Sequence, residues 1–115
     1  PGELPEVQMS DVLANLKAAR DAAISGGITV NGISVQTDDL SQQRLTSAAL
    51  AAQLDPTATV RWKTATGEFV TLTASQIVAI ALAVRAHVQA CFDREAELAE
   101  RIKTADDPGA VTITF

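Results

Sequence analysis

Cysteine and aromatic residues are scarce in this 115-residue sequence. Cys91 is the single cysteine, so no disulfide can form within the chain and nothing indicates an oxidising compartment. Aromatic residues make up 3% of the chain, and tyrosine is absent. The core must therefore consist mainly of Ala, Val, Ile and Leu, with Trp62 and three phenylalanines as the few large side chains.

Positive charge is also in short supply. Nine Lys and Arg residues are outnumbered by fourteen Asp and Glu, which gives a formal net charge of −5. The basic residues are scattered and have no interleaved aromatics, so we expect no nucleic-acid surface and no membrane binding. The first residues lack the basic and apolar segments of a signal peptide. The longest apolar run, residues 77–84, is too short to span a bilayer and is followed closely by Arg85 and His87.

Apolar residues are abundant enough to build a folded core. They make up 47% of the chain, against 20% charged residues, and the length suits one domain. The sequence starts with Pro1, and Met9 could be a native start. We therefore expect residues 1–8 to be a tail or an addition to the native chain, and residues 9–115 to form a single α+β domain.

Two segments have the apolar spacing of amphipathic helices. In residues 6–25 apolar side chains recur every three or four positions, and Gly26-Gly27 ends the pattern. A second helix is predicted at residues 39–53. It follows N-cap candidates at Thr37, Asp38 and Asp39, and Asp55-Pro56 stops it.

A third and much longer helix is predicted at residues 73–105. Thr73 and Gln76 form a capping-box pattern at its start. Its first half, residues 77–90, is apolar nearly all round, whereas its second half is amphipathic. At 1.5 Å per residue it would measure about 45 Å, against a diameter of roughly 35 Å for a domain of this size. We therefore expect its second half to project or to pack on another chain.

Two β-hairpins are predicted, at residues 28–35 and 59–72. The first turns at Asn31-Gly32, which places four apolar side chains on one face. In the second, a three-residue loop at residues 65–67 would pair Trp62 with Val70 and leave Gly67 free to take a positive φ. This arrangement unites the apolar side chains and is favoured over a two-residue loop. Residues 111–115 are interpreted as a final strand.

Chemistry-bearing residues do not form a recognisable site. His87 and Cys91 are four positions apart on the long helix, and Glu95 lies one turn further on. Tetrahedral zinc needs three or four ligands, and no second cluster accompanies this row. A thiol in the apolar surroundings of Cys91 is typically an inert core residue. We expect no enzymatic activity and no catalytic, cofactor-binding or metal-binding residues.

The order of these elements resembles a family of small phage and prophage domains. The resemblance rests on residues 30–38, 41–45, 62–63, 67 and 71–73, and on the helix at residues 77–102. That family is catalogued as of unknown function and is associated with tail-fibre and tail-assembly proteins. The resemblance implies a non-enzymatic domain located in the virion tail, or in the host bacterial cytoplasm during assembly.

Two functions follow as hypotheses. The first is a structural or assembly module that contacts other tail-fibre chains and forms a homo-oligomer, either a dimer or a trimer. Its contact surface is predicted on the second half of the long helix, at Cys91, Glu95, Leu98 and Ile102. The second is a binding module for a host-surface glycan or a fibre peptide. For that function Trp62, which is either a core or a surface aromatic, would have to border a groove.

Overall fold

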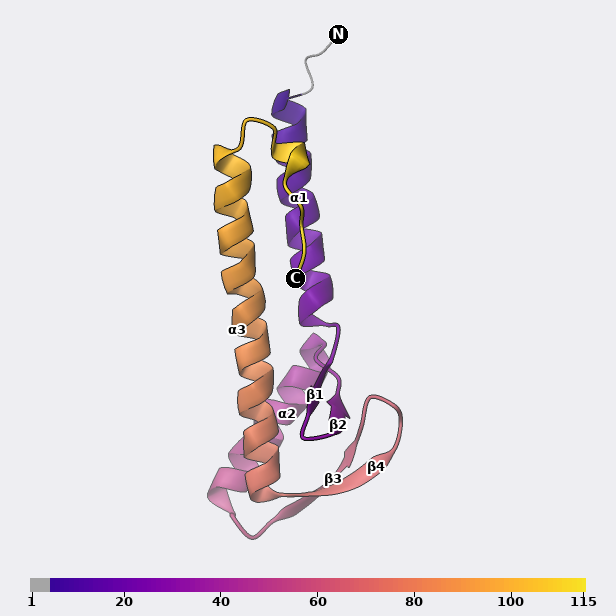
Figure 1. Ribbon diagram of the computed structural model, residues 1–115. Helices are drawn as coiled ribbons and strands as arrows, with labels where there is room; N and C mark the ends of the chain where they lie inside the picture. The colour runs from indigo at the N-terminus through magenta and orange to yellow at the C-terminus, as the bar shows by residue number, and fades with distance from the viewer. Residues whose placement is uncertain (1–4) are drawn as a thin grey trace. The chain divides into compact units, whose positions relative to one another are not determined.

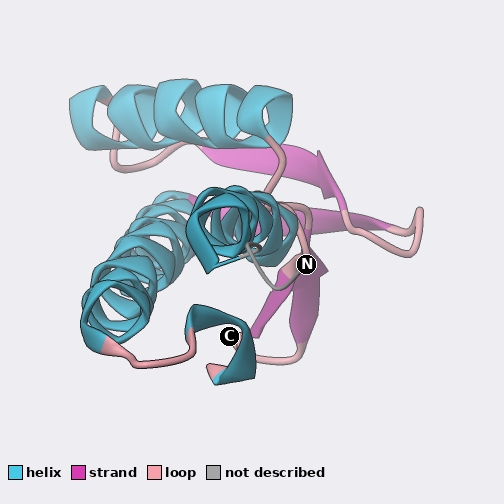
Figure 2. Cartoon of the chain, turned by 90° about the horizontal axis from the view of Figure 1, so that it is seen from above, coloured by secondary structure: helices cyan, strands magenta, loops and turns pink. Residues whose placement is uncertain are grey.

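The computed structural model describes the backbone of residues 5–115 and the side chains of residues 9–115. In this part of the chain the elements are α1 (Pro5–Ile24), β1 (Ile28–Val30), β2 (Ile33–Val35), α2 (Asp39–Leu54), β3 (Thr59–Lys63), β4 (Phe69–Thr73), α3 (Ala74–Thr104) and a 3-10 turn, η1 (Pro108–Ala110). The described helices and two separate antiparallel hairpins confirm the α+β class (Figures 1 and 2).

The chain contains two compact units. Unit 1 consists of Pro1–Ala23 and Gln89–Phe115, and unit 2 consists of Ile24–Val88. Helix α3 runs through both, so its first half belongs to unit 2 and its second half to unit 1. Each unit has its own hydrophobic cluster and is described by itself.

Both hairpins of unit 2 have the predicted register. In the first, Val30 pairs with Ile33, and both turn residues have the positive φ that a type I′ turn requires. In the second, Trp62 pairs with Val70. The predicted three-residue loop is closed by Thr64, whose backbone N–H donates to the Glu68 carbonyl over 2.7 Å. The favoured loop is therefore confirmed.

The hairpins pack with α2 and the first half of α3 into one core. Its fully buried members come from all of these elements: Val35, Leu45, Ala52, Leu72, Ala74, Ile77, Ile80 and Val84. The buried Thr37 fixes the approach to α2, because its hydroxyl accepts from Gly27 N–H over 2.9 Å and donates to the Ile24 carbonyl. The Ala65 N–H also donates to the Ser34 carbonyl over 3.0 Å, which links the two hairpins.

The helix starts follow the predicted capping chemistry. Asp38 is the N-cap of α2, and its carboxylate accepts from the Ser41 N–H. At α3 the Gln76 N–H donates to the Thr73 hydroxyl over 3.2 Å, while the Thr73 N–H donates to Gln76 Oε1 over 2.8 Å. This reciprocal pair confirms the capping box.

Unit 1 is built from α1, the second half of α3 and the chain after it. Leu16 of α1 and Leu98 and Ile102 of α3 are its buried centre. Partly buried side chains complete the cluster: Met9, Val12, Leu13, Ala99, Val111 and Ile113. The second half of α3 thus packs on the first helix of the same chain. The prediction that this half projects without cover from its own chain is therefore wrong.

The predicted strand at residues 111–115 is wrong. These residues pair with no strand, and the segment after η1 runs back along α1 (Figure 1). Val111 and Ile113 are partly buried in the unit 1 cluster, while Thr112 and Thr114 are exposed. Exposure therefore alternates along residues 111–114, and the apolar side of this segment lies against helices. The Thr114 carbonyl accepts a hydrogen bond from the Arg94 side chain instead of from a neighbouring strand.

Candidate functional site

The four residues predicted to contact another chain lie within unit 1. Leu98 and Ile102 are 0% exposed and Cys91 is 6% exposed, so these three are core side chains. Glu95 is half-buried and accepts from Arg20 Nη1 over 2.8 Å. Three of the four side chains are thus buried within the chain, and the fourth is paired within it. The prediction of a contact surface at these residues is therefore corrected.

Arg20 completes the polar edge of this packing. Its guanidinium also donates to Asp21 over 2.7 Å and lies 4.9 Å from the centre of the Phe92 ring. The pKa of Arg20 is raised mainly by the hydrogen bond to Asp21 and also by the hydrogen bond to Glu95, so the side chain remains a cation. These contacts join α1 to α3 and have a structural role.

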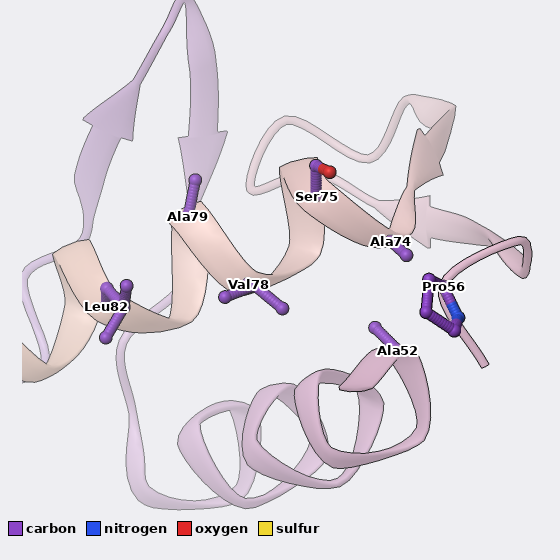
Figure 3. A pocket seen from close by; sticks show the side chains of 7 residues that line it. All are labelled: Ala52, Pro56, Ala74, Ser75, Val78, Ala79 and Leu82. Atoms are coloured by element: carbon purple, nitrogen blue, oxygen red, sulfur yellow. The ribbon is translucent and has the colours of Figure 1, made fainter. Parts of the chain in front are cut away.

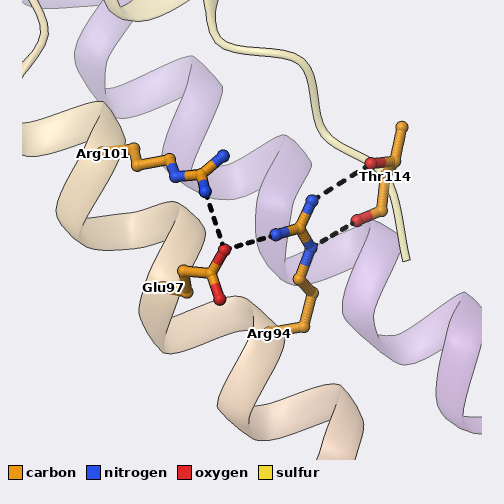
Figure 4. Close-up of polar contacts among 4 residues, drawn as sticks. All are labelled: Arg94, Glu97, Arg101 and Thr114. Atoms are coloured by element: carbon orange, nitrogen blue, oxygen red, sulfur yellow. Dashed lines mark hydrogen bonds and ion pairs between the residues drawn. The ribbon is translucent and has the colours of Figure 1, made fainter.

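A second polar group holds the C-terminal segment (Figure 4). Arg94 donates to the Thr114 carbonyl over 2.9 Å and to its hydroxyl over 3.2 Å. Glu97 accepts from Arg94 over 2.6 Å and from Arg101 over 2.9 Å. This part of the acidic helix face is thus internally paired, and exposed pairs of this kind contribute at most about 1 kcal/mol each.

His87 and Cys91 gain no further metal ligands. Among the described residues, no group of three or more His, Cys, Asp and Glu side chains could hold a metal ion. Burial raises the pKa of the Cys91 thiol, which disfavours the thiolate that nucleophilic or metal chemistry needs. The prediction of a packed cysteine agrees with its 6% exposure.

Trp62 borders a small pocket in unit 2. The indole is half-buried and packs against the unit 2 core, and β3 carries it beside the start of α2. The pocket is lined by Gln36, Ser41, Arg44, Trp62 and Lys63 and has a volume of about 210 Å³. Trp62 is therefore both a core and a surface aromatic, because its remaining exposed part forms a pocket wall.

The polar side chains of the Trp62 pocket differ in how free they are to bind a ligand. The Ser41 hydroxyl donates to Asp38, and this bond is the main cause of the lowered pKa of Asp38. The Lys63 ammonium lies 6.0 Å from the Phe69 ring centre, towards the neighbouring strand. Arg44 is exposed and forms no ion pair within 4 Å in the described part of the chain. Arg44 is thus the cation that is available to a ligand.

A second hollow in unit 2 is mainly apolar (Figure 3). It lies between the end of α2 and the start of α3, has a volume of about 340 Å³, and is lined by Ala52, Pro56, Ala74, Ser75, Val78, Ala79 and Leu82. We call it the α2–α3 groove. Leu82 is 63% exposed. A large apolar side chain thus faces solvent in the groove.

The sequence pointed to only part of these two sites. The sequence indicates Trp62 as a candidate contact residue, but it does not indicate that Gln36, Ser41 and Arg44 lie beside it, since their meeting depends on how α2 packs beside β3. The α2–α3 groove has an indirect signal in the sequence. A helix half that is apolar nearly all round needs cover on several sides, and Leu82 is on a side that remains uncovered.

Helix α3 also meets the length and composition criteria for a membrane span. Its most apolar 18-residue window has a mean hydropathy of 1.3 and is 22% buried. The core helix of a soluble protein meets the same criteria. Ile77, Ile80 and Val84 of this helix pack in the unit 2 core. The expectation that the chain does not span a membrane stays a prediction.

Comparison with known proteins identifies the family. Residues 8–115 match the model of a family described as Domain of unknown function (DUF4376), and the chain belongs to this family. The match extends over both units. No curated protein and no solved structure matches the chain.

Proposed function

We propose that this DUF4376 domain is a non-enzymatic association module of a bacteriophage or prophage tail-fibre or tail-fibre-assembly protein. We further propose that it self-associates through the α2–α3 groove. The exposed apolar surface at this groove carries the proposal. Leu82 is 63% exposed there and lies beside the apolar Pro56, Val78 and Ala79, and exposed apolar side chains that gather on one face commonly mark an interaction site.

The distribution of charge favours a second copy of the chain as the partner. Unit 2 has four basic residues and four acidic residues, namely Arg44, Arg61, Lys63 and Arg85 against Asp38, Asp39, Asp55 and Glu68. The net charge of −5 therefore resides in unit 1. Two copies would repel each other through unit 1 and meet without net repulsion at unit 2.

The tail-fibre setting rests on the sequence resemblance described above. Under this proposal the domain acts in the virion tail, or in the host bacterial cytoplasm during assembly, with other fibre chains as its partners. A homo-oligomer, either a dimer or a trimer, suits that setting. The groove supplies an apolar surface that copies of the chain can share, as closed symmetric assemblies require.

Light scattering across a concentration series tests this function. The wild-type protein should form a dimer or trimer at high micromolar concentration. Leu82→Gln should shift it towards the monomer, because an amide would be buried against an apolar partner. Leu40→Gln is the matched control, since Leu40 is 51% exposed but does not line the groove. A monomeric wild type, or equal effects of the two variants, would contradict the proposal.

The Trp62 pocket supports a second function, the recognition of a host-surface glycan or a fibre peptide. It combines an aromatic wall, the exposed Arg44 cation and two polar side chains. Small-ligand sites typically combine an apolar wall with a few convergent polar groups. None of its residues lines the α2–α3 groove, so the two functions can be tested separately.

A further inference from the structure

We propose that the Trp62 pocket binds a single acidic sugar, with the sugar carboxylate at Arg44 and one face of the sugar ring against the indole of Trp62. This inference rests on the second function above and specifies its ligand. It does not depend on self-association through the α2–α3 groove.

Arg44 provides the carboxylate partner. It lies on α2 one turn after Ser41, so both side chains reach the same side of the helix. Arg44 interacts electrostatically with the Asp38 carboxylate without forming an ion pair to it, and this carboxylate already accepts from the N–H and the hydroxyl of Ser41. Asp38 does not line the pocket. The planar guanidinium is therefore available for a bidentate bond to a ligand carboxylate.

Trp62 provides the wall for the sugar ring. Its pairing with Val70 and its contact with the unit 2 core fix the indole in place. A fixed ring loses little conformational entropy when a ligand packs on it. A sugar ring presents C–H groups on its faces, which suit an aromatic wall. A peptide carboxylate on a flexible side chain would leave much of this wall uncovered.

The remaining groups suit sugar hydroxyls. The Ser41 hydroxyl proton is directed to Asp38, so its oxygen is left to accept a hydrogen bond from a ligand. The exposed Gln36 amide can donate and accept. The volume of about 210 Å³ is below the roughly 300–1,000 Å³ of pockets for drug-sized ligands. One sugar unit therefore fits better than a longer saccharide.

Fluorescence titration offers a direct test, because Trp62 is the only tryptophan. The probes are glucuronate, galacturonate and N-acetylneuraminate, with glucose as the uncharged control and acetate as the carboxylate without a ring. At least one acidic sugar should change the emission saturably in the millimolar range, and glucose and acetate should bind more weakly. If no acidic sugar gives a saturable change, the proposal is wrong. Acetate binding as tightly as the sugars would overturn the role of the ring and favour a peptide carboxylate.

Two matched variants separate Arg44 from general electrostatics. Arg44→Gln and Arg85→Gln each remove one exposed positive charge from unit 2, but only Arg44 lines the pocket. Arg44→Gln should weaken binding of the acidic sugar by about tenfold or more, which is typical for a lost charge-assisted hydrogen bond. Arg85→Gln should leave it within about twofold. Equal losses in both variants would overturn the assignment of the carboxylate to Arg44.

Discussion

Replacing Leu98 by alanine tests whether the second half of α3 is a core or a contact surface. Leu98 is 0% exposed and packs with Leu16 and Ile102. Truncation removes the transfer free energy of the lost carbons and leaves a cavity that helices on both sides close only in part. Such substitutions lower the free energy of unfolding by about 2–5 kcal/mol. The total stability of a domain is only about 5–15 kcal/mol, so the effect should be large.

Leu82→Ala is the matched control, because it makes the same chemical change on the same helix at a side chain that is 63% exposed. Its cost should be below about 1 kcal/mol, since most of the side chain is already in water. Both variants would be unfolded in urea and followed by far-UV circular dichroism. The protein concentration must be low, because association would add its own stabilisation. Equal losses of unfolding free energy in the two variants, or a loss below about 1 kcal/mol for Leu98→Ala, would refute the burial of Leu98. Such a result would favour a contact of Leu98 with another chain.

Three further predictions concern backbone contacts and the cysteine. Thr37→Val should cost about 1–3 kcal/mol, because two backbone groups lose their partner, whereas the exposed Thr46→Val should cost less; urea unfolding that ranks them equally would contradict this. Gly27→Ala should be more destabilising than Gly67→Ala, since both residues have positive φ but only at Gly27 would a Cβ lie 3.2 Å from a carbonyl oxygen; the reverse order of melting temperatures would be inconsistent with that contact. Burial raises the pKa of Cys91, so the unfolded chain loses the thiol proton first and stability should fall as pH rises above about 8.5. Cys91→Ala should remove that part of the pH dependence of urea unfolding, and an unchanged slope would argue against it.

The hairpins and helix ends could be predicted because they depend on residues close together in sequence. Asn31-Gly32 specifies its turn through positive φ, and the turn sets which side chains pair. The three-residue loop at Gly67 follows from the register that puts Trp62 and Val70 on one face. Thr73 acts three residues from Gln76 and needs no tertiary context.

The features that the sequence did not predict depend on contacts between residues far apart in the chain. An amphipathic stripe indicates that Leu98 and Ile102 are buried, but not that α1 covers them. The alternation at residues 111–115 likewise indicates one apolar side, and the sequence does not say whether a strand or a helix lies against it. Arg44 reaches the pocket of Trp62 only through the packing of α2 beside β3. The sequence pattern shows at which spacing buried side chains recur, but it does not show which element covers them.

The discontinuous make-up of unit 1 has a consequence for the order in which the chain folds. Unit 2 is one uninterrupted stretch of sequence, whereas unit 1 combines segments from before and after it. A ribosome adds about 5–20 residues per second, so Leu16 leaves it roughly 4 to 16 s before Leu98. Until then the apolar side of α1 has no lasting cover. We expect amide protection during synthesis to arise first in unit 2 and last in α1, which pulsed hydrogen exchange on stalled nascent chains would detect.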